Sequence, residues 1–139
     1  MSITERVFLR NIMNLNTRKN KRAQGSGGEA YASTMLLKDG FSVLCRNYVC
    51  PGGEVDIIAT KEKYICFIEV KMRSACSGNV ASEAVDETKL SRIRTAIEHF
   101  FNEYRDNLYV MSLTPRIDVA EIYTSKGMVK RYNYIEGVE

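Results

Sequence analysis

Three short extended runs, joined by connections of only a few residues, constrain the fold of this chain more than any other feature. The runs are apolar and cover Phe41 to Asn47, Glu54 to Thr60 and Tyr64 to Lys71. Between them stand two turn-like segments, Pro51 to Gly53 and Lys61 to Lys63. Because parallel neighbours need a crossover of roughly a dozen residues or more, these runs must pair as an antiparallel meander.

A helical pattern precedes the meander. From Glu29 to Asp39, apolar residues recur at helical spacing and place Ala32, Met35 and Leu36 on one face. Gly40 follows at the position where a helix would stop. We therefore predict a helix that packs against the sheet.

A second, longer helical pattern covers residues 82 to 105, with Ser82 as its expected N-cap. Two strand-like runs follow, Arg116 to Tyr123 and Met128 to Ile135, separated by a turn that contains Gly127. The expected order is helix, three strands, helix, two strands.

Composition excludes several classes of protein. With 139 residues, of which 45% are hydrophobic, the chain is long enough to bury one core. No apolar run approaches the roughly 20 residues that span a bilayer. The four cysteines form no CxxC pair and the single histidine, His99, lies far from them, so we expect no zinc cluster and a structural His99. Cysteines inside apolar runs, without a secretion signal, favour a cytoplasmic protein with no membrane partner.

Positive charge is concentrated at the N-terminus. Residues 1–24 carry six basic residues and one acidic residue, and a Gly25 to Gly28 stretch separates them from the patterned remainder. We divide the chain into a basic arm at 1–24, partly helical or disordered, and a folded domain at 25–139. Such an arm suits a polyanion, and a merely solubilising tail is the alternative.

Three charged residues, Asp56, Glu69 and Lys71, lie inside otherwise apolar runs. Residues two apart in a strand share a face, so Glu69 and Lys71 project together. A hairpin of the second and third runs sets Asp56 beside them. Burying these charges costs on the order of several kcal/mol unless they pair or bind a cation. A divalent cation would account for their placement.

The chemistry of these side chains indicates phosphodiester hydrolysis. Carboxylate oxygens suit Mg²⁺ or Mn²⁺, which complete their coordination with water and phosphate. Such an ion activates water and neutralises charge on the phosphate, while a neighbouring lysine can orient that water or stabilise the transition state.

These residues resemble the PD-(D/E)-x-K signature of restriction-endonuclease-like nucleases. More of the chain, roughly residues 25 to 123, resembles the YraN-like family of predicted nucleases, which is distantly similar to archaeal Holliday-junction resolvases. The residues that carry this likeness are Gly28, Glu29, Ala32, Gly40, Phe41, Arg46, Asn47, residues 53–59 and residues 67–73. The chain departs from the signature at Val55, which stands where the name of the motif has proline.

The resemblance implies a restriction-endonuclease-like α/β fold, a three-layer α/β/α sandwich with a mixed central sheet. Carried over to this chain, Asp56 and Glu69 would be metal ligands and Lys71 the catalytic lysine. Glu29 would be the acid of the first helix that reaches the metal directly or through water. The residue pattern agrees, because it puts Glu29 on the helix face turned to the sheet.

Four further residues are weaker candidates. Glu54 shares a strand face with Asp56 and is either accessory to the site or solvated. Arg73, Lys89 and Arg92 could hold phosphates, and a solvated surface is the alternative for each.

We therefore expect a divalent-metal-dependent endonuclease that acts on nucleic acid, with structured or branched DNA favoured over RNA. The alternatives are a non-catalytic nucleic-acid-binding or assembly protein that keeps the nuclease fold, and a protein-interaction scaffold. A homodimer is expected only by analogy with junction resolvases.

Overall fold

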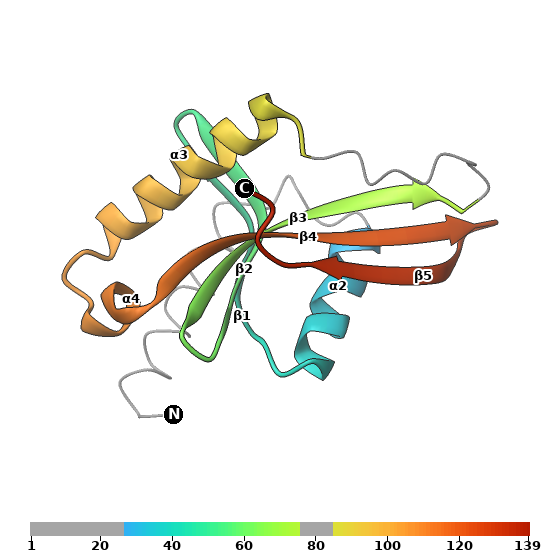
Figure 1. Ribbon diagram of the computed structural model, residues 1–139, viewed down its shortest axis with the longest axis horizontal. Coiled ribbons are helices and arrows are strands. Elements are labelled where there is room, and N and C mark those ends of the chain that lie inside the picture. The colour runs from blue at the N-terminus through green and yellow to red at the C-terminus, as the bar shows by residue number, and fades with distance from the viewer. Residues whose placement is uncertain (1–26, 76–84) are drawn as a thin grey trace.

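Five strands form one mixed sheet in the computed structural model, which describes residues 27–75 and 85–139 (Figure 1). Across the sheet they lie in the order β1-β2-β3-β4-β5. Strand β3 is parallel to β4, and the other neighbours are antiparallel. The bounds are β1 Ser42–Cys50, β2 Gly53–Lys61, β3 Tyr64–Ser74, β4 Thr114–Ser125 and β5 Met128–Ile135. The predicted meander of three antiparallel strands is confirmed as β1 to β3.

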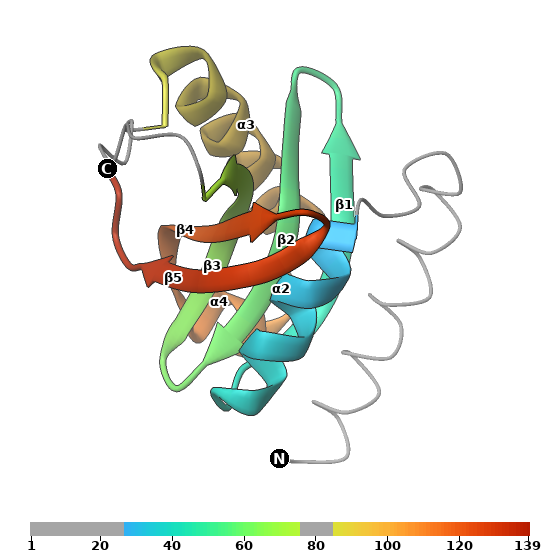
Figure 2. The ribbon, with the colours of Figure 1, turned by 90° about the vertical axis from the view of Figure 1, so that its right-hand side faces the viewer.

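Helices cover both faces of this sheet. Helix α2 (Gly27–Lys38) lies on one face, and helix α3 (Glu87–Glu103) lies on the other (Figures 1 and 2). Helix α3 belongs to the crossover between the parallel strands β3 and β4, as such a connection requires. The predicted α/β class is confirmed, and the three layers are consistent with a restriction-endonuclease-like fold.

The ends of the helices have local causes. Helix α2 stops before Gly40, which has φ of 89° as the prediction requires, and Phe41 N–H donates to Leu36 O at 3.0 Å. Helix α3 begins at Glu87, because the Asp86 side chain caps it by accepting from Lys89 N–H at 2.8 Å.

Two features of the helices differ from the sequence pattern. The predicted cap Ser82 lies outside the described residues, and the observed helix starts later than the pattern indicated. A short helix α4 (Leu108–Ser112), which the pattern did not indicate, precedes β4 and is capped by the Asn107 side chain.

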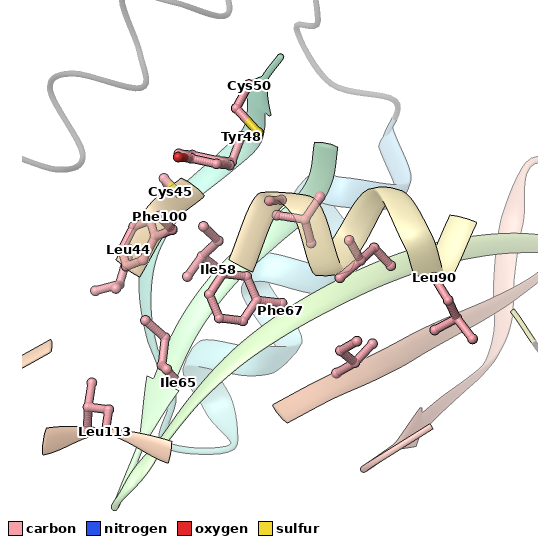
Figure 3. Close-up of a cluster of buried hydrophobic side chains, with 14 of the residues drawn as sticks. Leu44, Cys45, Tyr48, Cys50, Ile58, Ile65, Phe67, Leu90, Phe100 and Leu113 are labelled. Atoms are coloured by element: carbon pink, nitrogen blue, oxygen red, sulfur yellow. The ribbon is translucent and has the colours of Figure 1, made fainter. Parts of the chain in front are cut away.

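Two hydrophobic cores hold the layers together. Between the sheet and α3 lie Leu44, Ile58, Phe67 and Phe100, and the Phe67 and Phe100 rings meet edge to face with centroids 5.8 Å apart (Figure 3). Burial of each such side chain contributes about 1.5 to 3 kcal/mol. The core on the α2 side includes Ala32, Leu36, Ile57, Ile68 and Ile122.

The described cysteines and helices agree with two expectations from the sequence, buried reduced thiols and the absence of a long apolar helix. Cys45, Cys50 and Cys66 are buried and carry free thiols. None of the helices within the described ranges is long and apolar enough to cross a membrane. The basic arm at residues 1–24 and the fourth cysteine, Cys76, lie outside the described residues.

Candidate active site

The candidate site lies where strands β2 and β3 part. Their ladder ends at the pair Ile57 and Ile68, and Asp56 and Glu69 are the next residue on each strand. Val70 N–H donates to Asp56 Oδ2 at 2.8 Å. The Asp56 carboxylate therefore accepts a hydrogen bond from the neighbouring backbone and is fixed in place as the strands diverge.

The register places Asp56 and Glu69 next to each other on neighbouring strands, and each carboxyl group affects the pKa of the other. Glu69 is only 6% exposed. Burial raises the pKa of Glu69, and the adjacent Asp56 carboxylate raises it further. Burial also raises the pKa of Asp56, although the Val70 N–H and Lys89 oppose that change. Two acids held this close in a buried position favour a proton or a cation between them.

Lys89 reaches this pair from the first turn of α3. Its Nζ lies 3.1 Å from Glu69 Oε1, and the Asp86 cap fixes the turn that carries it. Burial lowers the pKa of Lys89, but the Glu69 and Asp56 carboxylates outweigh that effect and the pKa is raised. The sequence suggested Lys89 as a phosphate ligand, whereas the structure places it against an acid of the site.

Glu29 approaches the same acids from the opposite face of the sheet, on the first turn of α2. Burial raises its pKa, the Asn47 side chain lowers it by a hydrogen bond, and the Asp56 carboxylate raises it. Glu29 Oε2 is buried and has no hydrogen-bond partner. Glu29 thus carries an unsatisfied oxygen and is electrostatically coupled to Asp56.

Asn47 was named from the sequence only as part of the family likeness, and it was not among the predicted site residues. It stands on β1 between residues that pair with Val55 and Ile57, and so faces Asp56 in the register. Its φ is 55°, a left-handed value that asparagine adopts more readily than most residues. An asparagine inside an apolar run was the available signal. Such an outlier beside buried acids is typical of a functional site.

Lys71 follows Glu69 by two residues on β3 and shares its sheet face. It is partly exposed and stands beside Glu121 of β4 in the parallel register. Lys71 therefore shares a strand and a sheet face with Glu69, and its catalytic role stays a prediction.

The remaining candidates also contact acids. Arg92 lies 3.5 Å from Glu54, and both side chains are about half exposed. Glu54 raises the pKa of Asp56, but its effect is smaller than those of burial, the Val70 N–H and Lys89, so Glu54 has only a minor influence on the site. Arg73 Nε donates to Glu121 Oε2 at 3.0 Å. His99, expected to be structural, is hydrogen-bonded to Tyr48 Oη at 3.0 Å.

Asp56 and Glu69 suit a hard cation that takes the rest of its coordination shell from water and phosphate. Within residues 27–75 and 85–139, no three His, Cys, Asp or Glu side chains gather into a complete metal-binding group. Asp56 and Glu69 form a pair, and Mg²⁺ commonly binds one or two carboxylates and takes its other ligands from water and phosphate. The mutual repulsion of the pair and the unsatisfied Glu29 Oε2 fit such an ion. Asp56 and Glu69 would hold it, and the Glu29 carboxylate interacts electrostatically with Asp56.

Comparison with known proteins identifies relatives of the chain. A family model described as "Uncharacterised protein family UPF0102" matches residues 28–122, which include Glu29, Asp56, Glu69 and Lys71. A UPF0102 protein of Carboxydothermus hydrogenoformans is 37% identical over 99 residues, covering 71% of this chain and 80% of the relative. One of Dictyoglomus thermophilum is 38% identical over 122 residues, covering 84% and 96%. One of Saccharophagus degradans is 35% identical over 98 residues, covering 70% and 80%.

Proposed function

The chain belongs to the UPF0102 family, and from this premise we propose that it is a divalent-metal-dependent endonuclease that hydrolyses phosphodiester bonds in nucleic acid. The observation that carries the proposal is the pairing of half-buried Asp56 with buried Glu69 on neighbouring strands, with the pKa of both acids raised. Neighbouring acids whose pKa values are both raised favour a functional over a structural role.

Asp56 and Glu69 have the main part in this mechanism. Asp56 is oriented by Val70 N–H, and Glu69 is held on the neighbouring strand, so the two carboxylates would together bind Mg²⁺ or Mn²⁺. When bound, such an ion supplies an activated water and neutralises charge on the phosphate oxygens. Glu29 orients water at the edge of this pair, since its Oε2 is buried and accepts no hydrogen bond.

Lys71 and Lys89 supply the positive charge. Lys71 lies two residues from Glu69 on one face, where its ammonium would orient the attacking water and stabilise the negative charge that develops on the phosphate oxygens. Lys89 neutralises Glu69 before substrate arrives, through the ion pair of 3.1 Å. The favoured substrate is structured or branched DNA, because the family resembles junction resolvases, and a homodimer is proposed on the same analogy.

One observation favours a second candidate, a non-catalytic nucleic-acid-binding or assembly protein. The Lys89 ammonium already balances Glu69, and the described residues hold no complete metal group. A site neutralised in this way could remain metal-free and serve only the fold. The two candidates differ in whether product forms.

The test uses branched, linear and single-stranded DNA, and RNA, with Mg²⁺, Mn²⁺ or EDTA. The wild-type protein is compared with Asp56→Ala and Lys71→Ala, and with Asp106→Asn as a control that removes an exposed acid from the turn after α3. The enzyme predicts metal-dependent cutting that Asp106→Asn retains and the other two variants lose. Binding without product in every protein would support the second candidate. Absence of binding at low salt would support a protein-interaction scaffold instead.

A further inference from the structure

Beyond the carboxylate pair, the same face of the sheet continues as two rows of polar side chains across β3, β4 and β5. The register places Lys71 beside Glu121 and Glu121 beside Asn133. The next row places Arg73 beside Tyr123 and Tyr123 beside Arg131. We call these residues the polar face: Lys71, Arg73, Glu121, Tyr123, Arg131 and Asn133.

The polar face lies beyond the end of α3. Figure 1 shows β3, β4 and β5 continuing past the N-terminal end of that helix. Val119, two residues before Glu121 on β4, still packs into the core under α3. Because side chains alternate along a strand, Glu121 and Tyr123 project on the same side as Val119. The candidate active site and the polar face therefore share one surface, with Lys71 belonging to both.

A buried acid organises this face. Glu121 is 1% exposed and accepts hydrogen bonds from Arg73 Nε at 3.0 Å, Asn133 Nδ2 at 3.1 Å and Tyr123 Oη at 3.4 Å. Its charge is thereby engaged from three sides, and the Arg73 guanidinium is held in one orientation. A planar guanidinium that is fixed beforehand loses less entropy when it binds a phosphate.

The second arginine is held by stacking. The Arg131 guanidinium lies over the Tyr123 ring, 4.0 Å from its centroid, while the residue stays exposed. Tyr123 is itself buried and hydrogen-bonded to Glu121, so its ring is a rigid support for Arg131. Arg73 and Arg131 thus flank Tyr123 in one row.

We propose that the polar face binds the sugar–phosphate backbone of the nucleic acid that enters the candidate active site, with Arg73 and Arg131 contacting its phosphates; this inference rests on the proposed function. Charge complementarity supports it, since the face carries three basic residues and its acid is buried beneath them. Continuity supports it too, because Lys71 joins the face to Glu69. The planar forks of two arginines match phosphate geometry.

Lys38 provides a control of equal charge. It is exposed in the last turn of α2, the helix that covers the opposite face of the sheet (Figure 2). Replacing either Arg131 or Lys38 with glutamine removes one positive charge. Only the loss of a contact on the polar face should distinguish Arg131→Gln from Lys38→Gln.

The experiment measures binding of a fluorescein-labelled four-way DNA junction and of a linear duplex, by anisotropy in EDTA over a series of salt concentrations. For Arg131→Gln and Arg73→Gln we expect a Kd raised about tenfold. We also expect the slope of log K against log salt to fall by about one. Lys38→Gln should bind as the wild-type protein does. Because Arg73→Gln removes a partner of buried Glu121, Arg131→Gln is the variant that keeps the test independent of folding.

The inference would be overturned if Arg131→Gln bound like the wild type, or if Lys38→Gln weakened binding as much as Arg131→Gln does. Competition by polyglutamate as effective as that by unlabelled DNA would also overturn it, in favour of an acidic protein partner. Cleavage with Mg²⁺, followed on the same proteins, separates the two proposals. If the protein cuts DNA but both arginine variants bind it as the wild type does, only the inference about the polar face is wrong. If the arginine variants lose binding but the wild type does not cut, only the proposed nuclease activity is wrong.

Discussion

Two buried acidic centres of the same sheet are built in opposite ways. Asp118 on β4 is fully buried and accepts hydrogen bonds from Arg116 at 2.9 and 3.0 Å, from Gly137 N–H at 2.9 Å and from Tyr134 Oη. Asp56 and Glu69 instead face each other, and burial with mutual repulsion raises the pKa of Glu69. The first centre satisfies its acid with donors from the protein. The second leaves charge that a proton or a cation can relieve.

The comparison distinguishes an acid that stabilises the fold from the acids that we propose to bind a cation. At Asp118, the bonds fasten β5 and the segment after it to β4, so the centre stabilises the fold. At Asp56 and Glu69, the described donors are Val70 N–H and Lys89, which oppose the raised pKa values without cancelling the rise. A cation site requires acids that are held in place by a stable scaffold and whose negative charge the protein's own donors do not fully neutralise.

The largest expected effect is on catalysis. Replacing Lys71 with methionine or Asp56 with asparagine should lower the single-turnover cleavage rate by about ten-thousandfold, because each change removes charge from the reacting centre. Circular dichroism should show an unchanged fold. Cleavage by Asp56→Asn at a rate within a few-fold of the wild type would show that Asp56 is not a catalytic residue.

Asp118→Ala should have the next largest effect, on stability. Loss of this carboxylate leaves Arg116, whose side chain is only 18% exposed, without its bidentate partner. The free energy of unfolding in urea should fall by about 3 to 4 kcal/mol. A decrease under about 1 kcal/mol would mean that the saturated centre does not stabilise the fold, contrary to our account.

Gly53→Ala tests whether the site depends on the position of α3. A Cβ at residue 53 would lie 2.7 Å from Ala96 N and 2.8 Å from Arg92 O, both backbone atoms. The helix would have to shift away from β2, which should cost about 2 kcal/mol and weaken the Lys89 contact with Glu69. Urea unfolding measures the first effect, and metal affinity measures the second. Gly127→Ala is not a suitable control, because the φ of Gly127 is positive and any side chain there is strained. Ser112→Ala on α4 is the control, since it changes an exposed side chain away from β2.

The smallest effect concerns pH. The folded-state pKa of Glu69 is raised, so the folded protein holds this proton more tightly than the unfolded chain does. Stability of the metal-free protein should therefore increase as pH falls from neutrality through the folded pKa toward the ordinary value of 4.5. At neutral pH, Glu69→Gln should stabilise the metal-free protein by on the order of 1 kcal/mol, since like charges no longer meet. A larger pH dependence in Glu69→Gln than in the wild type would contradict this.

Much of the scaffold and the carboxylate pair follow from local patterns. Short turns force the β1 to β3 meander, and strand alternation with the hairpin register sets Asp56 beside Glu69. The placement of α3 does not follow from them, because the pattern extended to Ser82 while the Asp86 side chain caps the observed helix. The contact of Lys89 with Glu69 depends on that long-range placement.

Other parts of the site depend on backbone conformation and on pairing between distant strands. The left-handed Asn47 requires a φ value that an apolar pattern does not encode. The Glu121 network depends on the parallel pairing of β3 with β4, which brings together residues about fifty positions apart. Local sequence patterns encode turn lengths, but they do not encode contacts between strands that are far apart in the chain.

The most direct test of the central claim is calorimetric titration of Mn²⁺ into the wild-type protein, Asp56→Asn and Asp106→Asn at neutral pH. Our account predicts saturable binding to the wild type and to Asp106→Asn, and loss of that binding in Asp56→Asn. Absence of binding to the wild type, or binding to Asp56→Asn with unchanged affinity, would contradict it.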